Sequence, residues 1–201
     1  MPGCSVRWPR PLELAPRLLL ACALLLWAAH AWGRTLVDLL LPALRAAFLS
    51  LDDHYRILQL NTGSAGADSV IRLRVNLAQP MVVGGRVVVP HPLGAAEVTT
   101  AIGYVMQPLI IGLTLVLAWP WRTRAELAVR LVMAGALLVL ALWLDTPFVL
   151  WANLWDMHAR ALEPERFSPL LAWAQWLQGG GRLLLGGVAG TLAIIGGKAA
   201  C

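Results

Sequence analysis

Long runs of apolar residues alternate with short charged flanks along most of the chain. The first run occupies residues 14–33 and is interrupted only by Arg17 near its start. A second, uncharged run occupies residues 99–121, and a third occupies residues 127–145. A helix needs about 20 predominantly apolar residues to cross a bilayer. The pattern therefore predicts transmembrane helices in these three segments.

The last apolar run is harder to place because it contains Arg182. An arginine at the centre of a bilayer costs at least about 2.5 kcal/mol. We therefore predict an outer loop over residues 146–178, ending in a helix at the membrane interface, and a fourth span over residues 179–197. In this arrangement Arg182 lies near the outer headgroups, and Asp145, at the end of the third span, faces water. The predicted fold class is an α-helical integral membrane protein with four transmembrane helices and a small β-hairpin-rich extracytoplasmic domain between the first two.

Composition supports the bilayer as the surroundings of the chain. Charged residues make up only 13% of it and hydrophobic residues 59%, whereas a soluble domain carries about 25% charged residues. The ten tryptophans are also typical of membrane interfaces. The arginines flank apolar runs instead of forming a basic patch with interleaved aromatic residues, so a nucleic-acid partner is not predicted.

Basic residues predict the orientation, because short cytoplasmic loops are enriched in Lys and Arg. They precede the first span, separate the second from the third, and follow the fourth: Arg7, Arg10, Arg17, Arg122, Arg124, Arg130 and Lys198. We therefore predict that residues 1–13, 122–126 and 198–201 are cytoplasmic. The predicted location is a bacterial inner membrane, crossed several times, with both termini in the cytoplasm.

Two processing signals compete with an uncleaved N-terminal anchor. Ala29-His30-Ala31 resembles a signal-peptidase site, and the residues before Cys22 resemble a lipoprotein box. The residues after Cys22 stay apolar, so an uncleaved anchor is favoured. The other cysteines, Cys4 and Cys201, form no CxxC pair, and neither a zinc site nor any other cofactor is predicted.

Residues 34–98 change from helical to strand periodicity. Residues 34–51 keep helical spacing, with Pro42 as a point of bending. Residues 55–60 and 69–77 then read as strands, the second alternating apolar and basic positions. The segments 81–83 and 86–89 flank Gly84-Gly85, which is typical of a two-residue hairpin. We expect a small sheet whose apolar face is covered by other helices of the chain or by a partner.

The basic strand face, the hairpin and the glycines of the fourth span suggest a surface for a membrane protein partner. An exposed hairpin edge can accept a further strand, and a face of small residues permits close helix packing, within the chain or against a partner. The predicted partner-binding residues are Arg72, Arg74, Val82, Val83, Arg86, Val87, Gly186 and Gly190. The alternative is a sheet packed only on its own helices.

No complete catalytic motif is present, and no catalytic or metal-binding residue is assigned. A second hypothesis is a membrane-embedded enzyme with a carboxylate and imidazole site, possible metal ligands included, at the outer face. Its residues would be Asp52, Asp53, His54, His91, Asp156 and His158. A scaffold or small-solute channel has no positive support in the sequence.

One stretch of the chain resembles a known family. It reads YRILQLNTG from residue 55, SVIRLRVNLAQP from residue 69, and HPLGAAEVTTAIGYVMQPLIIGLTLVLAWP over residues 91–120. It resembles the exosortase H-associated membrane proteins, small accessory proteins of bacterial protein-sorting systems. Exosortases themselves use a membrane-embedded Cys with Arg and His near the outer face, and Cys22 offers no such set. The resemblance therefore implies a non-catalytic helper that docks to an exosortase-type peptidase.

Overall fold

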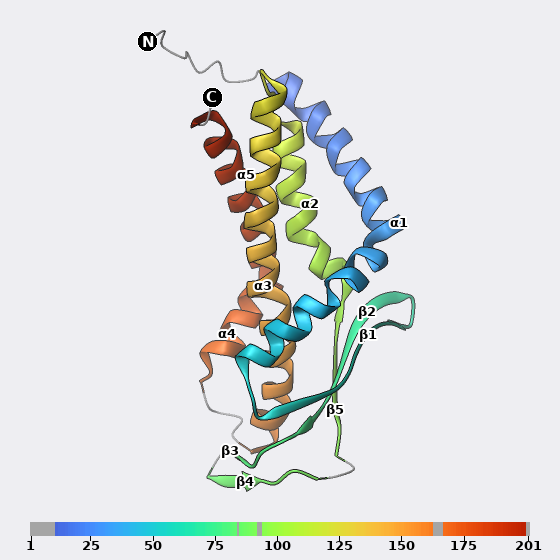
Figure 1. Ribbon diagram of the computed structural model, residues 1–201, viewed down its shortest axis with the longest axis vertical. Coiled ribbons are helices and arrows are strands. Elements are labelled where there is room, and N and C mark those ends of the chain that lie inside the picture. Colours follow the sequence, from blue (N-terminus) through green and yellow to red (C-terminus); the bar gives the residue numbers. More distant parts are fainter. Residues whose placement is uncertain (1–10, 84, 92–93, 163–166, 200–201) are drawn as a thin grey trace.

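The computed structural model of the chain describes residues 11–83, 85–91, 94–162 and 167–199 (Figure 1). The predictions for Cys4, Arg7, Arg10, Gly84 and Cys201 lie outside these residues. The elements follow one another as α1 (Pro11–Leu51), β1 (Tyr55–Ala65), β2 (Asp68–Leu77), β3 (Met81–Val83), β4 (Arg86–Val88), β5 (Ala96–Ala101), α2 (Ile102–Ala118), α3 (Arg124–Leu162), α4 (Pro169–Trp176), the π-helical turn η1 (Leu177–Gly181) and α5 (Arg182–Ala199).

The helices form a bundle at one end of the molecule, and the strands lie at the other (Figure 1). In the bundle, the first part of α1, α2, the first part of α3 and α5 run lengthwise, and α1 begins at the end where α5 finishes. The second part of α1, which contains Pro42, crosses toward the strands. Many large apolar side chains on the outside of α1, α3 and α5 are exposed. Such surfaces are typical of helices that face lipid.

The predicted fold class of four transmembrane helices is wrong. Among the described residues, three helical segments are long and apolar enough to cross a membrane: Leu14–Leu51, Arg124–Leu162 and Pro169–Lys198. The predicted second span, residues 99–121, divides into β5 and the 17-residue helix α2, which is at the short end of the range that can cross a bilayer. The cause is strand pairing, because β2 offers its free edge to Ala96–Ala101.

Helix α3 also continues beyond its predicted end at residue 145. It has 39 residues, about 58 Å at 1.5 Å per residue, roughly twice the hydrocarbon thickness. Residues predicted as an outer loop thus form its last turns. Their Leu150 and Leu154 side chains are buried against the sheet, which gives these turns a packing role at the sheet.

The main sheet is antiparallel, with strand order β1-β2-β5. The strands predicted at residues 55–60 and 69–77 are confirmed, although β1 extends to Ala65. In β2, Ile71, Leu73 and Val75 are buried, and the basic residues between them point to the opposite face. Side chains alternate across a strand, so the period-two pattern identified the buried face correctly.

The chain's own helices cover the apolar face of the sheet. Tyr55, Leu73 and Val98 from the three strands pack with Phe48 of α1 and Leu150 of α3 in one buried cluster. This arrangement fits the alternative in which the sheet packs on its own helices. It also explains how so small a sheet gains a core, because a few strands alone are marginal in water.

Strands β3 and β4 form the predicted hairpin as a separate two-stranded sheet. Val83 pairs with Arg86, so two residues connect the strands. Gly85 has φ +69°, which an L residue rarely adopts. Met81 and Val83 point inward and join the core cluster, while Val82 and Val87 are exposed.

The small residues of α5 lie against α2. A Cβ on Gly186 would lie 2.6 Å from the Pro108 carbonyl oxygen, and one on Gly190 would lie 2.8 Å from that of Gly112. Close approach of helix backbones through glycines is common in membranes. The glycine face therefore serves packing within the chain, and Gly186 and Gly190 are not available to a partner.

Candidate functional site

A buried ion pair joins α3 to the start of α5. The Nε atom of Arg182 donates hydrogen bonds to both carboxylate oxygens of Asp145, each at 2.9 Å. Arg182 is 2% exposed and Asp145 is 0% exposed. The prediction that Asp145 faces water is therefore wrong, and Arg182, predicted near the outer headgroups, is buried against Asp145. The pair compensates both charges, which makes their burial tolerable.

Local structure on both sides of Arg182 directs it toward Asp145. The chain kinks at η1, where Gly180 has φ +115°, outside the helical region. The guanidinium lies over the ring of Tyr104, 5.2 Å from its centroid, at the first turn of α2. Trp173 of α4 donates a hydrogen bond to the Leu144 carbonyl, 3.2 Å away, which ties α4 to α3 beside the pair.

A small polar pocket borders this ion pair. Its volume is about 230 Å³, and it lies where the end of β5 meets α2, α3 and the η1 turn. The side chains and backbone that line it come from Thr99, Thr100, Ala101, Tyr104, Val149, Asn153, Gln178 and Arg182. The walls thus combine hydroxyl, amide and guanidinium groups, which can donate hydrogen bonds to a ligand.

The sequence contains a signal for this site that an analysis of hydrophobic periodicity does not use. Asp145 and Arg182 are isolated opposite charges in otherwise apolar segments. Ionisable residues within membrane segments usually pair with one another and mark functional sites. Pairing two residues 37 positions apart in the sequence would have required knowing that α3 and α5 are neighbours.

A second buried arginine, Arg130, lies near the beginning of α3. The Arg130 side chain forms an ion pair with Glu126 one turn earlier. It also donates hydrogen bonds to the carbonyls of Trp119 and Pro120. These contacts hold the loop between α2 and α3, so Arg130 has a structural role.

The residues predicted to bind a partner do not form one surface. Val82, Arg86 and Val87 are exposed on the hairpin and Arg74 on β2, whereas Val83 is fully buried. Arg72 forms an ion pair with Glu97, with Nε 3.1 Å from the carboxylate oxygen. Val83 points inward because successive residues of a strand face opposite sides.

Asp52, Asp53 and His54 gather at the turn between α1 and β1. Their possible ligand atoms lie within 4.8 Å of one another. Asp52 already accepts hydrogen bonds from the His54 backbone amide at 2.9 Å and from Trp151 Nε1 at 3.0 Å. Its Oδ1 atom also lies 2.7 Å from His54 Nδ1. The cluster therefore works as a cap that fastens the turn to α3.

The other residues of the hypothetical enzyme site are only partly brought near this turn. The His158 ring lies 6.2 Å from that of Tyr55, and its Nδ1 atom is 2.9 Å from the Leu154 carbonyl oxygen. Asp156 forms an ion pair with Arg160. His91 lies in the segment after β4, where its carbonyl accepts a hydrogen bond from Asn76.

Tyr55 offers a stability test of this region. Its hydroxyl is buried without a hydrogen-bond partner among the described residues. Burial, with the nearby Asp52 charge, raises its pKa to about 12. The unfolded state ionises first as the pH rises above 10, so the protein should lose about 1 kcal/mol of stability by pH 11. Tyr55→Phe should remove this loss.

The measurement is equilibrium unfolding in mixed micelles at pH 8 and pH 11. At pH 8, Tyr55→Phe should be neutral or slightly stabilising, because an unsatisfied buried hydroxyl is removed. If the unmodified protein and Tyr55→Phe lost the same stability between pH 8 and pH 11, ionisation of Tyr55 would not be the cause of the loss.

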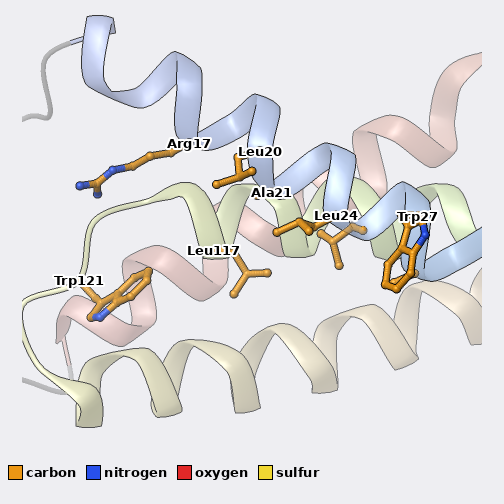
Figure 2. A pocket seen from close by; sticks show the side chains of 9 residues that line it. Arg17, Leu20, Ala21, Leu24, Trp27, Leu117 and Trp121 are labelled. Atoms are coloured by element: carbon orange, nitrogen blue, oxygen red, sulfur yellow. The ribbon is translucent and has the colours of Figure 1, made fainter.

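An apolar groove lies between α1 and α2 (Figure 2). Its volume is about 660 Å³, and its walls include Leu20, Leu24 and Trp27 of α1 and Leu117 of α2. The side chains of Arg17 and Trp121 lie at one end of it (Figure 2). Apolar walls with a basic and an aromatic residue at one end are typical of a lipid-facing surface.

No family model, no curated protein and no solved structure matches this chain.

Proposed function

We propose that the chain is a non-catalytic accessory protein of a bacterial inner membrane. It docks to a larger membrane enzyme and presents the β3–β4 hairpin to that enzyme or its substrate. An exosortase-type sorting peptidase is the proposed partner, because residues 55–63, 69–80 and 91–120 resemble the accessory family described above.

The observation that carries this proposal is the valine pair on the outer face of the hairpin. Val82 and Val87 are cross-strand partners, 66% and 62% exposed. Val89, just after β4, is also exposed. The inward residues Met81 and Val83 hold the hairpin on the core. A fixed apolar patch at the end of the molecule remote from the helix bundle is suited to a protein interface.

The hairpin also offers backbone groups. It is a separate two-stranded sheet, and strands with free edges can accept an extended peptide, whose main chain supplies the affinity. Arg86 at the start of β4 and Arg74 on β2 are exposed, and they would favour acidic groups on the partner.

Helix α2, although shorter than the other three, also runs lengthwise through the bundle, so the beginning of α1 and the end of α5 lie at the same end (Figure 1). The proposed orientation places this end, and with it both chain ends, in the cytoplasm. The basic residues of these segments lie at the beginning of α1, in the α2–α3 loop, at the first residue of α3 and at the end of α5: Arg17, Arg122, Arg124 and Lys198. These lie at one end of the bundle (Figure 1). A basic end of this kind is expected on the cytoplasmic side, and it would leave the hairpin outside.

Co-purification of the tagged chain in mild detergent tests the proposal. We expect a membrane peptidase or transferase to be recovered in stoichiometric amount and identified by mass spectrometry. The double variant Val82→Asp/Val87→Asp should reduce this recovery at least tenfold, which corresponds to a loss of about 1.4 kcal/mol in binding.

Leu58→Asp is the matched control, since Leu58 is an exposed apolar residue at the irregularity of β1, outside the hairpin. It should leave the recovery unchanged. Isolation of the chain alone in several mild detergents, or equal recovery with the hairpin variant, would refute the docking role.

A further inference from the structure

We propose that the pocket beside Arg182 binds a phosphate group, supplied by a lipid headgroup or as free phosphate. Arg182 lines this pocket although its side chain is almost wholly buried. Asp145 occupies its Nε atom, and no described residue accepts a hydrogen bond from its Nη atoms. The edge of the guanidinium that carries these two atoms is therefore left for a ligand.

The ion pair orients the guanidinium for this task. The two carboxylate oxygens of Asp145 share the single N–H of Nε in a bifurcated hydrogen bond, and the Tyr104 ring packs against the guanidinium. A guanidinium held in this way presents its remaining donors as a planar fork, which matches two oxygens of a phosphate. Asp145 also compensates the charge of Arg182 while the pocket is empty, which keeps a buried arginine tolerable.

The other walls of the pocket suit an anion. The residues that line it include hydroxyl-bearing ones, Tyr104, Thr99 and Thr100, and the amides Asn153 and Gln178. No carboxylate is among the described residues that line it. Hydrogen bonds from neutral groups to a charged phosphate are stronger than those to a neutral acceptor. They would therefore help to hold the phosphate despite the negative charge of Asp145 on the other side of the guanidinium.

The depth of the site favours a lipid as one source. Asp145 lies 21 residues after Arg124, about 32 Å along the helix, which is close to the hydrocarbon thickness of a bilayer. The pocket therefore lies at headgroup level. Leu183 and Leu184, which follow Arg182, are exposed and can contact acyl chains. The volume of about 230 Å³ holds on the order of seven waters, enough for a headgroup phosphate.

Thermal unfolding of the purified chain in phosphate-free maltoside tests the site. The probes are inorganic phosphate, dihexanoyl phosphatidylglycerol, and dihexanoylglycerol, which has the same acyl chains without phosphate. A ligand that binds the folded state at 100 times its Kd should raise the midpoint by about 5 °C or more. If only dihexanoyl phosphatidylglycerol raises the unfolding midpoint, the phosphate comes from a lipid. If inorganic phosphate raises the midpoint equally, the ligand is a free anion.

The double variant Asp145→Leu/Arg182→Met removes both charges and should abolish the rise. Asn153→Leu, which leaves the ion pair intact, should weaken binding at least tenfold and decides the matter if the double variant does not fold. Arg56→Met, which removes an exposed arginine from β1, should bind as the unmodified protein does. No rise with either phosphate probe, an equal rise with dihexanoylglycerol, or full binding by the pocket variants would overturn the proposal. Because the chain is titrated alone, these results do not depend on whether it has a protein partner.

Discussion

Arg182→Met alone is expected to destabilise the protein by about 3–5 kcal/mol, because it leaves the buried carboxylate of Asp145 without a partner. Asp145→Leu alone should lower the free energy of unfolding by a similar amount, since it leaves the buried guanidinium of Arg182 without a partner. The double variant should be close to the unmodified protein or more stable, because apolar side chains of similar volume often replace a buried ion pair without loss. Equilibrium unfolding in mixed micelles measures all three.

This prediction depends on strong non-additivity between two residues in direct contact. Arg56→Met removes an exposed arginine and should change stability by no more than about 0.5 kcal/mol. If the two single variants were as stable as the unmodified protein, or if the double variant lost the sum of their effects, the ion pair would not be a coupled unit.

Gly186→Val is expected to destabilise the bundle by about 2–3 kcal/mol or more, since overpacking a close contact forces the backbone apart. A Cβ at this position would lie 2.6 Å from the Pro108 carbonyl oxygen and 2.9 Å from its Cα atom. Neither atom is at the end of a flexible side chain, so the helices themselves must separate.

Gly187→Val is the matched control. It adds the same side chain to the same helix, but no atom lies within 4 Å of the added Cβ. Unfolding of the two variants in identical micelles should therefore separate packing from helix propensity. A different result would be equal stability of the two variants, with only Gly186→Val failing to recover the partner protein. That result would show that Gly186 contacts the partner and not α2.

Local pattern was sufficient wherever the physical cause is local. The shortage of charge and the long apolar runs indicate a membrane protein, because lipid-facing surfaces exclude charged side chains. In β2, alternation of Ile71, Leu73 and Val75 with basic residues predicted the strand and its buried face. The hairpin was predictable from its turn chemistry, since few residues other than glycine suit its positive φ.

Pattern failed wherever an apolar segment had more than one possible neighbour. Residues 99–121 are uncharged, and nothing local distinguishes the strand at Thr99 and Thr100 from the helix that follows. Pairing with the edge of β2 decided this. In the same way, α3 continues beyond Asp145 because Leu150 and Leu154 pack against the apolar face of the sheet.

The sequence by itself determined that the chain belongs in a membrane, where strands β1 to β4 lie and which face of β2 is buried. Only the tertiary structure decided that Arg182 pairs with Asp145, that Gly186 contacts α2, and that Val83 and Val87 lie on opposite faces of the hairpin. The physical reason is that periodicity reports the surroundings of a residue averaged along its own segment. The partner of a buried charge, or of a glycine without a side chain, is set by which segments become neighbours in space.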